Sequence, residues 1–127
     1  MLEHLRQRAV EILASSQTAT LSTSGPAGIQ ARSFPCEALG LALYFLIPTV
    51  SDQLVNLESE PSVVVSTTRW QLNGSGRIVP VNEVPPALAL LRSPETSGCA
   101  LVEIRPLRLH INRHNGWGFS ETIDLDP

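Results

Sequence analysis

The pattern of apolar and polar residues defines three elements in succession between residues 41 and 68. Residues 41–47 are apolar without alternation, which predicts a strand buried on both faces, as in a barrel wall covered by a helix or a partner subunit. Pro48 ends this strand. The next residues place leucine and valine on one side of a short helix, and three valines at 63–65 predict another buried strand.

The polar residues at the start of this short helix are candidates for two roles. Thr49 or Ser51 can cap the first free amides, and the negative charge of Asp52 is favourable in the first turn. The same amides form an anion site by themselves. Capping does not exclude contact with a ligand, so both roles stay open.

The rest of the pattern predicts further strands and a covering helix. Apolar residues at helical spacing indicate an N-terminal helix that covers a sheet, and a short linker helix is expected within residues 84–94. Antiparallel strands are expected at residues 18–22, 28–34, 39–47, 62–68, 71–81, from Cys99 onward, and 117–125. The chain should therefore be mainly β (α+β), with six to seven strands and two or three peripheral helices.

Two of these strands contain an irregularity. Residues 73–76 read Asn-Gly-Ser-Gly, which is typical of a hairpin turn, a bulge or a close approach of the backbone to a ligand. In the strand from Cys99, apolar residues fall on even positions through Ile104 and on odd positions from Leu107. This slip predicts a bulge or bend near residues 105–106, where a long strand turns a barrel corner. Asn115-Gly116 then predicts a tight hairpin.

Composition places these elements in one domain, residues 1–127. The 127 residues of the chain, 43% of them hydrophobic, suffice for one core. A chain of this length is too short for two ordinary domains. Its formal charge is −3, and its nine basic residues are scattered arginines, so we expect no nucleic-acid partner. No apolar run is long enough to span a membrane and the first residues are charged, so a cytoplasmic protein is expected.

The side chains that most often carry chemistry are sparse. Cys36 and Cys99 match no ligand or redox spacing and are interpreted as two unlinked, mostly buried thiols. His110 and His114 would share a face only on a helix, so no metal site is predicted in the strand and turn expected there. No nucleophile and base form a recognisable hydrolase motif. Any chemistry would therefore depend on a cofactor.

The order of elements and several local strings together resemble the FMN-binding split-barrel family, which is related to pyridoxamine 5′-phosphate oxidase. The strings include TATLST, GIQARSFP, SVVVSTT, NGSGRIVPV and ALVEIRPLRLHI. The most specific is the family pattern Thr-Pro-x-x-Ser-x-Lys-x-x-Asn-Leu-x-x-x-Pro, which matches residues 47–61. The resemblance implies an antiparallel split β-barrel and a homodimer with flavin, typically FMN, at the subunit interface.

The resemblance also implies candidate cofactor-binding residues. Arg32 lies where the family commonly places an arginine on the flavin phosphate, although an arginine in a strand is also typical of a solvated or ion-paired side chain. Trp70 and Gln71 match the region where family dimers reach the partner's flavin, although Trp70 could equally pack in a core or interface. The full candidate set is Arg32, Ser33, Ile47, Thr49, Ser51, Gln53, Trp70 and Gln71.

The chain departs from the family pattern at two positions. Gln53 stands where FMN-binding members often have lysine, and Ile47 where they have threonine. We expect the Gln53 side chain to point toward the same cleft as the capping hydroxyls. A neutral amide there predicts weaker phosphate binding than a cation would give, and the charge of Asp52 also opposes a phosphate.

The resemblance thus favours an FMN-binding split-barrel protein, for which flavin-dependent oxidation or reduction of an unassigned small molecule is one expected activity. The alternative is a non-enzymatic split-barrel module, a sensor, carrier or interaction protein, that has lost tight flavin binding. Deazaflavin or haem in the same cleft is a third interpretation. A dimer is expected because strand 41–47 is apolar on both faces and Trp70 looks exposed, leaving more apolar surface than one helix covers.

Overall fold

The computed structural model of the chain describes residues 3–92, 96–115 and 117–125. The helices are α1 (Glu3–Ala14) and α2 (Asp52–Ser59), with single 3₁₀ turns η1 (Val81–Glu83) and η2 (Ala89–Arg92). The strands are β1 (Thr18–Thr23), β2 (Gln30–Leu39), β3 (Ala42–Pro48), β4 (Ser62–Ser66), β5 (Trp70–Ile78), β6 (Cys99–Asn112) and β7 (Phe119–Asp124).

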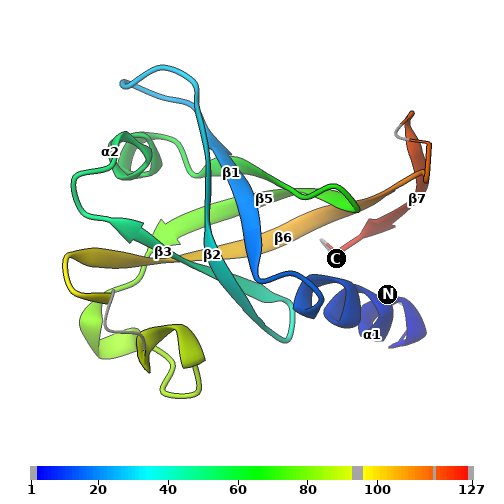
Figure 1. Cartoon of the computed structure of the whole chain (residues 1–127), viewed down its shortest axis with the longest axis horizontal. Coiled ribbons are helices and arrows are strands. Elements are labelled where there is room, and N and C mark those ends of the chain that lie inside the picture. Colours follow the sequence, from blue (N-terminus) through cyan, green and yellow to red (C-terminus); the bar gives the residue numbers. More distant parts are fainter. Residues whose placement is uncertain (1–2, 93–95, 116, 126–127) are drawn as a thin grey trace.

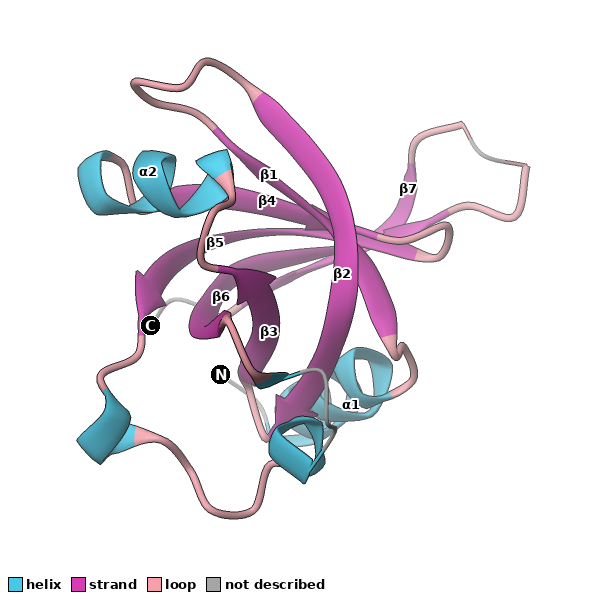
Figure 2. Cartoon of the chain, turned by 60° about the vertical axis from the view of Figure 1, so that its left-hand side comes forward, coloured by secondary structure: helices cyan, strands magenta, loops and turns pink. Residues whose placement is uncertain are grey.

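The strands form one antiparallel sheet that closes on itself. Its order is β3-β2-β1-β4-β5-β6-β7, and a further pairing of β3 with β6 closes six strands into a barrel. Strand β7 pairs with the far end of β6, outside the closed barrel. Helices α1 and α2 lie toward opposite ends of the barrel (Figures 1 and 2). The predicted mainly β split barrel with peripheral helices is confirmed.

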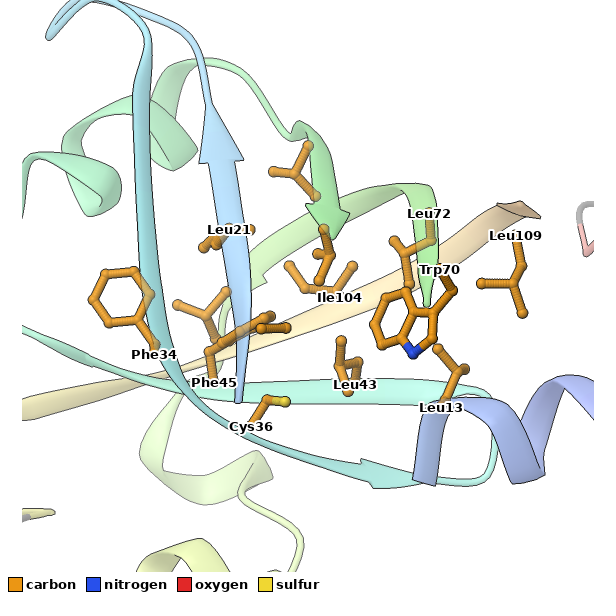
Figure 3. Packing of buried hydrophobic residues seen from close by; sticks show 14 of the residues in the cluster. Leu13, Leu21, Phe34, Cys36, Leu43, Phe45, Trp70, Leu72, Ile104 and Leu109 are labelled. Carbon is orange, nitrogen blue, oxygen red and sulfur yellow. The ribbon is translucent and has the colours of Figure 1, made fainter. Parts of the chain in front are cut away.

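The barrel interior is an apolar core. Side chains from six strands meet there, among them Leu21, Phe34, Leu43, Phe45, Val65, Leu72 and Ile104 (Figure 3). Helix α1 closes one end by burying Ala9 and Leu13 completely. Each large apolar side chain removed from water contributes roughly 1.5–3 kcal/mol, so this interior is the main source of stability.

Strand β3 is buried on both faces, as its uninterrupted apolar pattern predicts. Leu43 and Ile47 point into the barrel, while Tyr44 and Leu46 belong to a second apolar cluster on the outside. That cluster is completed by Leu88 and other residues from the connection between β5 and β6. The outer cover of β3 is therefore the chain's own segment and not a partner subunit.

Polar contacts join the strands of the barrel wall to one another and to this cover. The Tyr44 hydroxyl donates to Glu103 at 2.7 Å, and Arg77 Nε donates to the same carboxylate at 3.0 Å. Burial raises the pKa of Glu103, but these two hydrogen bonds outweigh it, so the pKa lies below its usual value. The Glu37 carboxylate accepts hydrogen bonds from the first two amides of η2, at 3.1 and 2.9 Å.

Several element boundaries differ from the predictions. Leu39, expected in the third strand, ends β2, and the hairpin turn falls at Gly40, whose φ of 60° favours glycine. Where the linker helix was expected, the described residues form the single 3₁₀ turn η2, and the last strand begins at Phe119. The predicted turn residue Gly116 and the end of the linker at residues 93–95 lie outside the described residues.

Both cysteines are unlinked thiols, as predicted. Cys36 and Cys99 form no disulfide in the described chain. Burial raises the pKa of the Cys36 thiol to about 11, so this thiol stays protonated at neutral pH. Cys36 is therefore a small apolar member of the core.

The glycine-rich stretch of β5 is part of a bulge between β5 and β6. Asn73 pairs with Arg108 and Gly74 with Pro106, which leaves Leu107 as the extra residue on β6. This is where the slip in the apolar pattern predicts it. A Cβ on Gly74 would lie 2.9 Å from the carbonyl oxygen of Arg105, so only glycine lets the two backbones approach this closely.

Replacing Gly74 with alanine should therefore destabilise the barrel. The added methyl group must displace a backbone carbonyl, and overpacking of this kind costs about 1–3 kcal/mol. Chemical denaturation of Gly74→Ala measures the loss. Ser75→Ala, one residue along the same strand, is the control and should change stability by less than about 0.5 kcal/mol. Equal stability of the two variants would contradict this account, because it would show that β5 and β6 can move apart at Gly74 with little loss of folding free energy.

Candidate functional site

A small cleft opens where β2, the end of β3 and the start of α2 meet. Its volume is about 240 Å³, and it is lined by Arg32, Phe34, Pro48, Val50, Ser51 and Asp52. Arg32 of β2 is opposite Leu21 of β1, which is buried in the core. Arg32 itself is exposed, because it lies close enough to the end of the barrel for its side chain to reach solvent. The structure therefore brings together Arg32 and Ser51, two of the predicted site residues.

The start of α2 gives this cleft a polar wall. Ser51 is the N-cap, and its Oγ accepts a hydrogen bond from the Gln53 amide at 3.2 Å. The remaining free amides and the helix dipole favour an anion at this position. Asp52 opposes this, and no ion pair joins it to Arg32 among the described residues. The cleft thus carries one cation and one anion.

Gln53 does not face the cleft, so the expected orientation of its side chain is wrong. The side chain is 1% exposed and turned toward β1. Its Nε2 donates to the Leu21 carbonyl at 3.0 Å, and its Oε1 accepts from the Thr23 hydroxyl. A buried amide must satisfy both its donor and its acceptor, and β1 supplies both partners.

Asn56, one turn further along α2, completes this anchoring and was missed by the sequence analysis. The residue is fully buried. Its Oδ1 accepts from the Ala27 amide at 2.9 Å, and its Nδ2 donates to the Gly28 carbonyl at 2.8 Å and to Thr23 Oγ1 at 3.1 Å. We call Gln53 and Asn56 the amide pair. Two side chains three residues apart in a helix lie on the same face. This spacing was the signal from which a shared role of Gln53 and Asn56 could have been predicted.

The other predicted residues on the cleft side are engaged elsewhere. The Thr49 hydroxyl donates to the Gly98 carbonyl at 3.1 Å, and its own amide donates to the same oxygen at 2.9 Å. Thr49 therefore stabilises the loop beside the cleft without lining it. Ile47 is fully buried in the core.

Ser33 and Gln71 belong to the outer surface of the barrel. Ser33 is opposite Thr20, with their hydroxyl oxygens 3.0 Å apart, and Gln71 is opposite Ser66. Cross-strand partners face the same side of a sheet, so each of these pairs shares one face. Neither Ser33 nor Gln71 lines the cleft beside α2.

Trp70 is fully buried, so the expectation that it is exposed is wrong. Its indole lies in the core near Leu13 (Figure 3). Its Nε1 has no hydrogen-bond partner among the described residues. Of the two interpretations considered for Trp70, core packing is the one that the structure shows.

The described residues hold no cluster of three side chains suited to a metal ion. A hydrogen bond of 2.8 Å joins His110 Nδ1 and Thr122 Oγ1. The His110 ring also stacks on Phe119, with ring centroids 4.3 Å apart.

None of the helices in the described part of the chain has the length and apolar character that crossing a bilayer requires.

The closed barrel is similar to several solved structures. A candidate pyridoxamine 5′-phosphate oxidase from Listeria innocua matches with a TM-score of 0.69 at 18% identity, over 84% of this chain and 97% of that one. General stress protein 26 from Bacillus anthracis matches with a TM-score of 0.66 at 18% identity, over 96% and 99% of the two chains. The chain has the split-barrel fold of the pyridoxamine 5′-phosphate oxidase-like proteins.

Split barrels with other cofactors are also similar to this chain. A heme-binding protein from Mycobacterium smegmatis matches with a TM-score of 0.68 at 16% identity, over 98% of this chain and 59% of that one. An F420 reductase and a FAD-binding protein from Mesorhizobium loti each match with a TM-score of 0.58. The sequence itself matches no family model and no curated protein.

The buried position of Gln53 predicts the effect of placing the family's lysine there. Gln53→Lys would remove the amide oxygen that accepts from the Thr23 hydroxyl and place a charge in the interior, which costs about 2–4 kcal/mol of folding free energy. Ser59→Lys, at an exposed position of the same helix, is the matched control and should cost less than about 0.5 kcal/mol. Urea denaturation compares the two variants. If Gln53→Lys is as stable as Ser59→Lys, the side chain at 53 leaves the core easily.

Proposed function

We propose that this chain binds a flavin-type cofactor in the cleft beside Arg32 and Ser51, with FMN as the first candidate. The observation that carries the proposal is the meeting of Arg32 with the N-terminus of α2 in one cleft. A guanidinium and free helix amides are the groups that hold a phosphate. The similarity to flavin- and F420-associated split barrels supports this choice.

The residues of the cleft suit the two parts of FMN. Arg32, the Ser51 hydroxyl and the start of α2 would hold the phosphate, while Phe34, Pro48 and Val50 offer an apolar wall to the ring. Flavin, when bound, supplies hydride transfer. The protein would position the ring and keep water away from it, so the proposed activity is flavin-dependent oxidation or reduction of a small molecule. With Gln53 buried and Asp52 present, phosphate binding should be weaker than in a site with two cations.

We further propose that a second copy of the chain completes the site. A cleft of about 240 Å³ is smaller than the roughly 300–1,000 Å³ that is usual for ligand sites. Val50, Ile29 and Val55 are 91%, 86% and 47% exposed. All three belong to α2, the loop before it, or the β1–β2 loop bound to it through Asn56. The covered β3 and buried Trp70 give no support to a dimer, so the proposal rests on this end of the barrel.

A non-enzymatic role for the same fold is the second candidate function. It is favoured by the near neutrality of the cleft, in which Asp52 offsets Arg32 and no lysine is present. Haem or deazaflavin binding would use the same cleft. The absorption spectrum of the concentrated protein separates these functions, because flavin, deazaflavin and haem absorb at different wavelengths and a protein without cofactor shows none of these bands.

The phosphate assignment predicts a difference between two flavins. Arg32→Ala should weaken FMN binding by about tenfold, the scale of a hydrogen bond between charged groups, because the phosphate loses its cation. Riboflavin, which has no phosphate, should bind equally well to both proteins. Quenching of flavin fluorescence measures both affinities. Arg6→Ala, on the exposed side of α1, controls for the loss of one positive charge. An equal loss of FMN and riboflavin would mean that Arg32 holds the ring or the fold.

The dimer proposal predicts a position-dependent effect of a charged substitution. Light scattering at low micromolar concentration should show a dimer for the wild type. Val50→Asp should shift it toward monomer, because a buried charge at an apolar interface is not compensated. Val81→Asp is the matched control, since Val81 is 93% exposed on η1, away from the cleft. A wild-type monomer, or equal dissociation of both variants, would contradict the proposed interface.

A further inference from the structure

A larger cavity is lined by residues of α1, of the turn before β5, of the end of β6 and of the start of β7. These elements lie toward the end of the barrel opposite α2 (Figure 1). The volume of the cavity is about 950 Å³. Arg8 of α1, Arg69 from the turn before β5, and Arg113 and His114 after β6 line it. We call it the basic pocket. It shares no residue with the cleft beside α2.

The basic pocket concentrates positive charge in a chain that is negative overall. Three of the nine arginines line it, no described aspartate or glutamate does, and the net charge of the chain is −3. Arg8 is ion-paired with Glu121. No ion pair joins Arg69 or Arg113 to a carboxylate of the described residues. These two guanidinium groups can therefore take an anion from outside the chain.

Hydrogen bonds fix the two segments that carry these arginines. The Asn112 amide donates to the Arg69 carbonyl at 2.8 Å, and its side chain donates to the Thr68 carbonyl at 3.2 Å. Arg113 Nε donates to the Phe119 carbonyl at 3.2 Å. The turn before β5 and the end of β6 are thus joined before any ligand arrives, which lowers the entropic cost of binding.

A groove lined by hydroxyl groups continues from the basic pocket across the outer surface of the barrel. Its volume is about 560 Å³, and it shares Thr68 and Arg69 with the pocket. Ser33, Thr20 and Ser66 stand opposite one another on β2, β1 and β4, so their side chains form a row on this face. Such a row suits the uncharged, hydroxyl-bearing part of a ligand.

We infer that the basic pocket and this groove bind a small organic phosphate, with its phosphate at Arg69 and Arg113 and its polyol part along the hydroxyl row. Arginine binds phosphate through paired, charge-assisted hydrogen bonds, and no carboxylate of the described residues is ion-paired with Arg69 or Arg113. Sugar phosphates and the ribose phosphate part of nucleotides share this chemistry. The site is separate from the proposed flavin cleft and does not depend on it.

Calorimetric titration with ribose 5-phosphate at about 150 mM salt tests the inference, with inorganic phosphate and ribose as comparison ligands. We expect saturable binding of ribose 5-phosphate, weaker binding of inorganic phosphate and none of ribose. Arg69→Gln and Arg113→Gln should each weaken ribose 5-phosphate by about tenfold. Ser66→Ala should weaken ribose 5-phosphate but not inorganic phosphate.

Two matched variants separate binding in the basic pocket from a general charge effect and from binding in the flavin cleft. Arg6→Gln removes the same charge from another part of α1 and should leave binding unchanged, and Arg32→Gln should do the same. Equal weakening by Arg6→Gln would show a general charge effect, and loss of binding in Arg32→Gln would place the ligand in the flavin cleft. Either result, the absence of saturable binding, or equal affinity for phosphate and ribose 5-phosphate would overturn the inference.

Discussion

The cleft depends on the hydrogen bonds of two buried amide side chains. Gln53 and Asn56 lie inside the protein, where an unsatisfied amide costs about 1–3 kcal/mol for each group left without a partner. Their partners are on β1 and in the β1–β2 loop, so α2 can take one position over the barrel end. That position brings the Ser51 cap beside Arg32 of β2. The amide pair thus fixes the geometry that makes an anion site available.

The barrel supports this arrangement by covering its own apolar faces. The pairing of β3 with β6 closes the sheet, and the segment between β5 and β6 covers the outside of β3. Helix α1 buries Ala9 and Leu13 at one end. What stays apolar and exposed near the cleft is a small group on α2 and the adjacent loops. The interface that we propose for a second copy therefore lies at the cleft end of the barrel.

Features that depend on local patterning were predictable from the sequence. The uninterrupted apolar run of β3, the cap of α2 and the slip in β6 each follow from periodicity or from one residue's backbone preference. The direction of the Gln53 side chain was not predictable, because its partners lie about 30 residues away on β1. The exposure expected for Trp70 and the strand expected to run through Gly40 were wrong for related reasons. The burial of Trp70 depends on α1, and a single glycine is a weak signal for a turn.

A crystal structure of the protein with FMN tests the central claim most directly, since it shows the ligand and the amide pair together. We expect the phosphate beside Arg32 and the start of α2, with Gln53 still bonded to the Leu21 carbonyl. A phosphate held elsewhere, or a Gln53 side chain turned out of the core to contact it, would contradict the proposed role of the amide pair.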